Sequence, residues 1–177
     1  EPATRTSSRF EGTVETLGVR ADREWGTRQA TRIGYEFERE RYVSDSVPEA
    51  AALAWTADIT QDSHAASVEH EVRFDALQVA GSLRAQGFTL DAVRLAPADR
   101  APFAATSFAT PPSALTADIS AARMFVRTGT KLRSHAGNGY RAPTMFERAG
   151  VSFGSFGYTV YGDPRIGPER SVSLDVG

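Results

Sequence analysis

The sequence contains no cysteine among its 177 residues. A chain without thiols forms no disulfide framework, no thiolate metal site and no cysteine nucleophile. The sequence also lacks an excess of either charge, with a formal net charge of -2 and a pI of about 6.0. Because such a chain offers no basic field for phosphate backbones, we expect no nucleic-acid partner.

Long hydrophobic runs are missing as well. No segment approaches the roughly 18 consecutive apolar residues of a membrane-spanning helix. The first residues, Glu1 to Arg5, do not show the basic and then apolar pattern of an export signal. These absences exclude helical membrane proteins, and they leave a soluble domain or a β-barrel, which both fit 41% hydrophobic and 24% charged residues.

Patterns that would indicate catalysis or metal binding are scarce. His64, His70 and His135 lie in different segments, and no Gly-rich phosphate loop or paired-carboxylate motif occurs. His70 interrupts the apolar side of a strand, and a lone histidine in a strand is far more often structural than a ligand. We therefore predict no enzymatic activity, no metal site and no cofactor.

Alternation of apolar and polar residues is the strongest pattern that is present. Ile33, Tyr35 and Phe37 alternate with charged or small residues, as in a half-buried β-strand. The apolar sides of the predicted strands are Leu17, Val19 and Ala21; Ile33, Tyr35 and Phe37; Val68, Val72 and Phe74; Leu77, Val79, Gly81, Leu83 and Ala85; Leu115, Ala117, Ile119 and Ala121; Leu132 and Ala136; and Val172, Leu174 and Val176. The fold class is therefore all-β, an antiparallel meander of about seven strands. The start of the first strand stays open, because Val14 is out of register with Leu17.

The connections between these strands alternate in length. Short links are predicted at 24–27, 75–76 and 124–128, and long connections at 43–63, 89–112 and 142–170. Short turns at one end and long loops at the other are typical of outer-membrane barrels. Aromatic residues flank both ends and predict two membrane-interface girdles, one of Trp25, Phe74 and Phe125 and one of Tyr42, Phe88 and Tyr140. Aromatic residues also favour strands in general, so the girdles are a secondary argument.

The second side of the strands is heavily charged. Its residues are Arg20, Asp22, Arg32, Glu36, Glu38, Glu69, Glu71, Arg73, Arg84, Lys131 and Arg133. In a barrel they would line a wet lumen, whereas in a soluble β-sandwich they would be solvated surface. We favour the barrel because of the asymmetry of the loops.

Two sequence boxes lie at the end of the sixth predicted strand and before the seventh. The first is Gly139-Tyr140-Arg141-Ala142-Pro143 with Glu147, after the strand sequence Gly-Thr-Lys-Leu-Arg at 129–133. The second consists of Gly162, Pro164, Pro168, Glu169 and Ser171. Together, at this spacing, they resemble the signature near the C-terminal part of TonB-dependent outer-membrane receptors. The sequence departs from that pattern at His135 and at Gly167, where a lysine is commoner.

This resemblance implies that residues 1–177 form part of a transmembrane β-barrel that seven strands cannot close alone. It further implies a plug domain, a TonB box and an export signal before Glu1, and more strands beyond Gly177. The complete protein would lie in the outer membrane of a Gram-negative bacterium. There it would contact membrane lipid and TonB, and import a small molecule or metal chelate, such as an iron-siderophore complex or vitamin B12.

The boxes also have a structural interpretation. Pro143 lacks an amide donor, so strand pairing should end there, and Pro164 and Pro168 should keep the chain extended before the next strand. Arg141 and Glu169 could form an ion-pair network at the barrel rim, or each could be solvated alone. For Glu147 we expect independent solvation, because exposed ion pairs are weak.

The segment between the boxes is rich in aromatic residues and glycine. Phe153, Phe156, Tyr158 and Tyr161 are the candidate ligand-binding residues, because stacking side chains on an adaptable loop suit recognition. The alternative is a surface loop packed on itself. For the protein as a whole, the alternatives to energised uptake are a passive porin-like or structural outer-membrane barrel, and a soluble β-sandwich that binds a partner.

Overall fold

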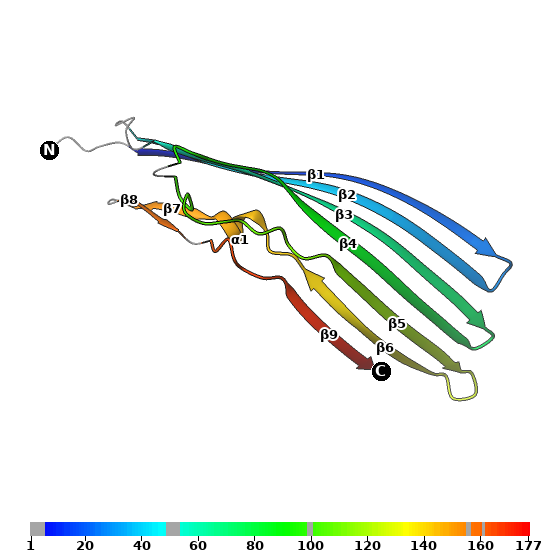
Figure 1. The fold of residues 1–177 in the computed structure, drawn as a ribbon. Helices are drawn as coiled ribbons and strands as arrows, with labels where there is room; N and C mark the ends of the chain where they lie inside the picture. The colour runs from blue at the N-terminus through cyan, green and yellow to red at the C-terminus, as the bar shows by residue number, and fades with distance from the viewer. Residues whose placement is uncertain (1–5, 49–53, 99–100, 155–156, 161) are drawn as a thin grey trace.

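The computed structural model describes residues 6–48, 54–98, 101–154, 157–160 and 162–177, and it contains one large antiparallel sheet. The sheet has seven strands in the order β1-β2-β3-β4-β5-β6-β9 (Figure 1). Its strands are β1 (Thr6–Trp25), β2 (Gln29–Pro48), β3 (Trp55–Phe74), β4 (Leu77–Ala96), β5 (Ala114–Phe125), β6 (Thr130–Arg141) and β9 (Glu169–Val176). The predicted all-β meander of about seven strands is confirmed.

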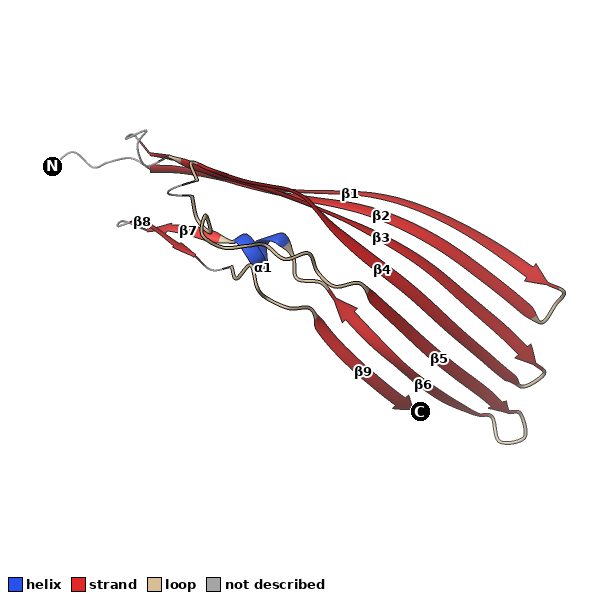
Figure 2. Ribbon diagram, in the orientation of Figure 1, coloured by secondary structure: helices blue, strands red, loops and turns tan. Residues whose placement is uncertain are grey.

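Between β6 and β9 the chain forms a short helix, α1 (Met145–Ala149), and a hairpin of β7 (Val151–Gly154) and β8 (Gly157–Val160). Figure 2 shows the large sheet as a curved wall, with α1 and the hairpin at the end away from the short turns. In the part of the chain that is described, β1 and β9 lie at opposite edges of the sheet, which is therefore open.

Three short turns join the strands at one end, close to the predicted positions. Gly26 and Gly129 have φ values of 67° and 68°, and Asp75 has a φ of 43° in the link between β3 and β4. Successive cross-strand pairs connect Trp25, the last residue of β1, to Ala121 in β5. Strand β5 continues past Ala121 to Phe125, so its turn lies further along the sheet. The turn ends are thus staggered, as expected for barrel strands tilted by about 35–45°.

Strands β1 to β4 are much longer than predicted, with 20 residues each. The predicted long connection 43–63 is wrong, because β2 runs to Pro48 and β3 begins at Trp55. The predicted connection 89–112 is shortened in the same way, since β4 runs to Ala96. A tilted transmembrane strand needs only about 9–11 residues, so in a membrane-spanning barrel about half of each long strand would lie outside the membrane.

Residues that are paired across the sheet share a face, and successive residues of a strand alternate between the two faces. The residues of the sheet therefore fall into an inner and an outer set. The inner face carries Arg20, Glu36 and Arg84, and the outer face carries Val19, Ile33 and Val68. In the half of the sheet near the short turns, the outer face is largely apolar and uncovered. Exposed fractions there are 63% for Val19 and 58% for both Ile33 and Ile119. An apolar face of this extent requires lipid or a partner to cover it.

The buried core lies on the inner face of the extended strand ends. One cluster contains Tyr42, Ile59, Met145 and Ala149, and the other contains Trp55, Ala57, Ala101 and Val151. Strands β2 and β3 therefore pack against α1, the hairpin and the β4–β5 connection.

This placement overturns part of the second predicted girdle. Tyr42 is only 6% exposed within the core, and Phe88 pairs with Ser63 on the inner face. The first girdle has the predicted orientation, since Trp25, Phe74 and Phe125 all lie on the outer face at the turn ends.

Candidate functional site

The two sequence boxes meet at the far end of β6, where Arg141 joins them. Its guanidinium donates to Glu147 at 2.8 and 3.1 Å and to Glu169 at 2.9 and 3.2 Å. The structure thus forms the ion-pair arrangement considered for Arg141 and Glu169. The expectation that Glu147 is independently solvated is wrong, because the helix turn brings its carboxylate back to Arg141.

Glu147 also closes the N-terminus of α1. The side chain of Thr144 accepts a hydrogen bond from the Glu147 amide, and the Thr144 amide donates to the Glu147 carboxylate, which together form a capping box. Hydrogen bonds from Arg141 and from the Thr144 amide lower the pKa of Glu147 to about 2. The carboxylate therefore stays charged and links the helix start to the strand end.

Gly162 fastens the second box to the end of α1. Its amide donates to the Gly150 carbonyl at 2.9 Å, and the Asp163 amide donates to the Glu147 carbonyl at 3.0 Å. A Cβ on Gly162 would lie 2.6 Å from backbone atoms of Arg148, Ala149 and Gly150. Only glycine permits this approach, so the close docking explains the glycine of the box. A Cβ on Gly167, in contrast, would meet nothing within 4 Å.

The three prolines have different roles. Pairing of β6 ends at Arg141, just before Pro143, as predicted. Pro164 does not extend the chain as predicted but occupies a β-turn, in which the Ile166 amide donates to the Asp163 carbonyl at 3.0 Å. Its fixed φ suits the second position of such a turn. Pro168 lies directly before β9, which begins at Glu169.

The strand residues of the boxes support this junction. Gly139 pairs with Ser171, and a Cβ at Gly139 would lie 2.6 Å from the Ser171 hydroxyl. The Tyr140 hydroxyl donates to the Pro112 carbonyl at 2.7 Å, and its ring lies 6.0 Å from that of Phe88. Ala142 is the first residue after β6.

Arg148 is a buried cation that ties several segments together. It is 1% exposed and donates to Gln61 at 3.1 Å, to the Ala109 carbonyl and to the Pro164 carbonyl at 3.5 Å. Burial lowers the pKa of Arg148, while the charge of Glu40 raises it. One side chain of α1 thus connects β3, the β4–β5 connection and the second box.

The candidate ligand-binding residues lie in and around the hairpin held by this junction. Phe153 in β7 pairs with Tyr158 in β8. Phe156 and Tyr161 lie outside the described residues. The role of these four aromatics in binding stays a prediction.

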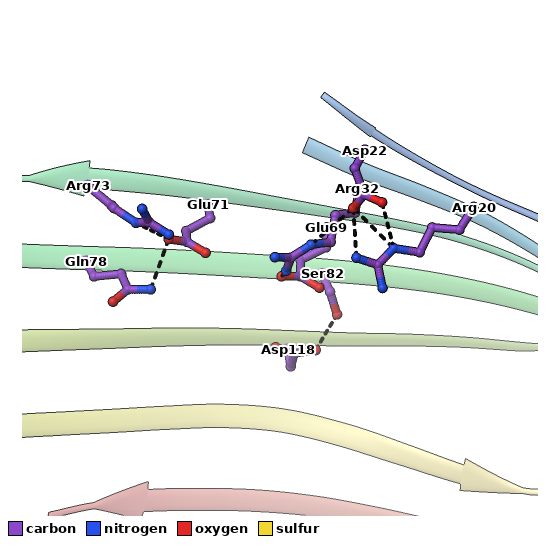
Figure 3. Close-up of polar contacts among 9 residues, drawn as sticks. All are labelled: Arg20, Asp22, Arg32, Glu69, Glu71, Arg73, Gln78, Ser82 and Asp118. Carbon is purple, nitrogen blue, oxygen red and sulfur yellow. Dashed lines mark hydrogen bonds and ion pairs between the residues drawn. The ribbon is translucent and has the colours of Figure 1, made fainter. Parts of the chain in front are cut away.

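The inner wall near the short turns is covered by paired polar side chains (Figure 3). Asp22 contacts both Arg20 and Arg32, and Arg32 also contacts Glu69. Further pairs on this wall are Arg73 with Glu71, Gln78 with Glu71, Ser82 with Asp118, and Arg84 with Glu36. Most charges of the predicted lumen therefore compensate one another within the wall, and no side-chain partner is seen for Glu38, Lys131 and Arg133 among the described residues.

The outer face changes character along β2 and β3. The Tyr35 hydroxyl lies 2.7 Å from His64 Nδ1, and the Phe37 ring is 5.1 Å from the His64 ring. The next outward residue, Arg39, forms two hydrogen bonds to Asp62 at 2.8 and 2.7 Å. The apolar stretch from Gln29 to Phe37 has the length of about 9–11 residues that a tilted strand needs to cross a membrane.

The family comparison agrees with this geometry. The model of the family described as TonB dependent receptor-like, beta-barrel, matches residues 2–177. The chain belongs to this family. Comparisons with curated proteins and with solved structures gave no match.

Membership of this family decides the predicted location and the general function. TonB-dependent receptors are non-enzymatic transporters of the Gram-negative outer membrane, and they couple substrate transport to TonB. This confirms the predicted location, the predicted absence of enzymatic activity and the general transport function. Because short turns face the periplasm in such barrels, the extended halves of β1 to β4 project from the cell.

Two observations on the described residues complete the site. No helix there is long and apolar enough to cross a membrane. No cluster of three or more His, Asp or Glu side chains that could hold a metal ion occurs there either. His70 instead lies 2.9 Å from the Thr31 hydroxyl through Nδ1.

Thr144 and Arg148 were not predicted from the sequence. The spacing Thr144-x-x-Glu147 is the signature of a capping box and would have indicated α1. Arg148 carries no comparable signal, because its burial depends on segments that are far away in the sequence.

Proposed function

We propose that this receptor captures a small molecule or metal chelate at its extracellular mouth and imports it with energy from TonB. An iron-siderophore complex or vitamin B12 is the kind of cargo we expect. The proposal includes a plug domain and additional strands, since outer-membrane transporters of this kind have about 22 strands around a plugged lumen.

The attachment of the β7–β8 hairpin is the observation that carries the proposal. Residues 151–160 follow directly on α1, and the bond between Gly162 and Gly150 closes the base of the hairpin. Binding loops work best when a rigid scaffold positions them. The two sequence boxes, the capping box and Arg148 supply such a scaffold for an aromatic-rich loop.

Transport can be tested in cells that express the complete receptor with or without TonB. A panel of ferric siderophores and vitamin B12 would be offered at limiting concentration, and uptake and surface binding would be measured separately. We expect uptake to require TonB and binding to persist without it. Equal uptake in both strains would instead support the passive barrel.

The role of the hairpin needs a separate measurement once a cargo is found. The Tyr158→Ala/Tyr161→Ala receptor should bind it at least tenfold more weakly, because the stacking of one nucleic-acid base on an aromatic ring, a comparable contact, is worth about 1–3 kcal/mol. Phe74→Ala, on the outer face at the opposite end, is the control and should bind normally. Unchanged affinity of the tyrosine variant would remove the hairpin from the binding site.

A further inference from the structure

The outer face carries two arginines at its turn-side edge, each over an aromatic ring of the girdle. The Arg23 guanidinium carbon lies 4.0 Å from the centre of the Trp25 ring, and that of Arg123 lies 5.0 Å from the centre of the Phe125 ring. Both arginines are exposed. A cation within about 6 Å of the centre of an aromatic ring is attracted electrostatically by the face of that ring.

Neither of these arginines has a carboxylate partner among the described residues. In the last turn-side pairs of β1 to β6, the outer face contains aliphatic, aromatic and uncharged polar residues besides them. Of the acidic residues at this end of the sheet, Glu24 and Glu71 have inner-face positions in the register, and Asp75 lies in a turn and pairs with Arg28 at 3.4 Å. This edge of the outer face is therefore positive.

The opposite edge of the apolar belt is different. There Arg39 pairs with Asp62 and Arg41 pairs with Asp58, at 2.7 and 2.8 Å. Arg39 and Arg41 are thus neutralised by carboxylates of the protein, whereas Arg23 and Arg123 are available to a partner.

We propose that Arg23 and Arg123 bind phosphate groups of anionic phospholipids in the periplasmic leaflet. The positive edge lies directly beside the apolar face that contacts lipid acyl chains. The two arginines therefore lie at the depth of the lipid headgroups. Guanidinium groups match phosphate oxygens in geometry and charge. Each arginine is a separate anchor, because four strand spacings of about 4.8 Å separate β1 from β5.

The Trp25 indole reinforces one of these anchors. Its Nε1 donates to the Thr31 hydroxyl at 2.9 Å, and that hydroxyl contacts His70. These bonds fix the ring on which Arg23 rests, so the guanidinium is presented at the interface rather than free to swing away.

The test uses the complete folded receptor with phosphatidylglycerol and phosphatidylcholine of the same chain length in equal amounts. Native mass spectrometry gives the ratio of the two lipids that stay bound. The wild type should prefer phosphatidylglycerol, and Arg23→Gln/Arg123→Gln should lose about fivefold in this preference for each arginine removed. A matched control, Arg20→Gln/Arg133→Gln, removes two charges from the inner face and should keep the preference.

Equal preference in the wild type and Arg23→Gln/Arg123→Gln would overturn the proposal. A salt titration of the wild type gives a second test that needs no variant, since raising ionic strength from about 0.1 to 1 M shortens the screening length from about 10 to 3 Å and should reduce the preference. A preference that salt leaves unchanged would also contradict it. If Arg23→Gln/Arg123→Gln lost binding of lipopolysaccharide but kept that of phosphatidylglycerol, the two arginines would not contact the periplasmic leaflet, and this part of the proposal would be refuted.

Discussion

At the scale of single residues, the two glycines of the second box, Gly162 and Gly167, differ in the space around them. Gly162→Ala would place a Cβ 2.6 Å from three backbone atoms at the end of α1, whereas Gly167→Ala meets nothing within 4 Å. We expect Gly162→Ala to destabilise the junction by about 1–3 kcal/mol, as overpacking usually does.

Limited proteolysis of the extracellular segments would measure this difference. Cleavage within 142–168 should be faster in Gly162→Ala and unchanged in Gly167→Ala. Equal cleavage rates in the two variants would mean that the docking of Gly162 on α1 does not hold the loop.

Glu147 should make the junction sensitive to acid. Its pKa of about 2 lies below the value of about 4.3 for an unfolded chain, so its stabilising effect is complete above about pH 4.3 and disappears as the pH falls through about 2. A fluorophore on a cysteine introduced at the exposed Ile166 would report the motion of the loop.

The wild-type receptor should show an increase in probe mobility between about pH 4.3 and 2. Glu147→Gln should lack this step and be mobile throughout, and Glu38→Gln, which removes a carboxylate without a seen partner, should behave as the wild type. A step that persists in Glu147→Gln would assign the acid sensitivity to another group.

The contact between Arg141 and Glu147 can be measured with a double-mutant cycle. Arg141→Ala, Glu147→Ala and the double variant would be compared by loop proteolysis. Because the two side chains share two hydrogen bonds, the double variant should lose less than the sum of the single losses. Strict additivity would show that the contact contributes nothing.

At the scale of elements, the sequence predicted the strands in the part where one face contacts lipid, because apolar and polar residues alternate there. Ile33, Tyr35 and Phe37 face lipid, and the periodicity there is unambiguous. Past Phe37 the outer face meets water, so Arg39 and Arg41 replace apolar residues, while Tyr42 turns inward to the core. The alternation is lost although the strand continues, and the predicted loop at 43–63 was wrong for this reason.

Helix α1 illustrates a second limit of prediction. Five residues are too few for a helical period to show in the sequence. The element depends on local capping by Thr144 and Glu147 and on contacts of Met145 and Ala149 with Tyr42 and Ile59. The sequence boxes identified the place and the family, but the way in which α1 joins them needed the three-dimensional arrangement.

Arg148 should couple the extracellular elements. Arg148→Met leaves the acceptors on Gln61, Ala109 and Pro164 without their donor, which costs about 1–3 kcal/mol for each group that stays buried. Proteolysis within both 97–113 and 162–168 should then increase together. Arg165→Met, at the neighbouring exposed arginine, should affect neither segment, and loosening of one segment alone would contradict the coupling.

At the scale of the whole molecule, the seven strands form a wall with two environments along its length. Near the short turns the wall is apolar outside and carries paired charges inside, as a membrane-spanning barrel requires. Beyond Phe37 it is charged outside and carries the buried core, α1 and the hairpin inside. The boundary between membrane and extracellular space therefore crosses β2 between Phe37 and Arg39.

Residues 1–177 contain no cysteine, so single cysteines introduced into β2 would be the only thiols of these strands and would report this boundary directly. Single cysteines placed along β2 from Thr31 to Val43 in the reconstituted receptor would carry spin labels, and collisions with oxygen and with a water-soluble nickel complex would be compared. Labels at 31, 33, 35 and 37 should favour oxygen, and those at 39, 41 and 43 should favour the nickel complex. Oxygen accessibility that continues to Val43 would mean that no boundary lies between Phe37 and Arg39, and oxygen accessibility at the even-numbered positions would mean that the other face of β2 contacts lipid.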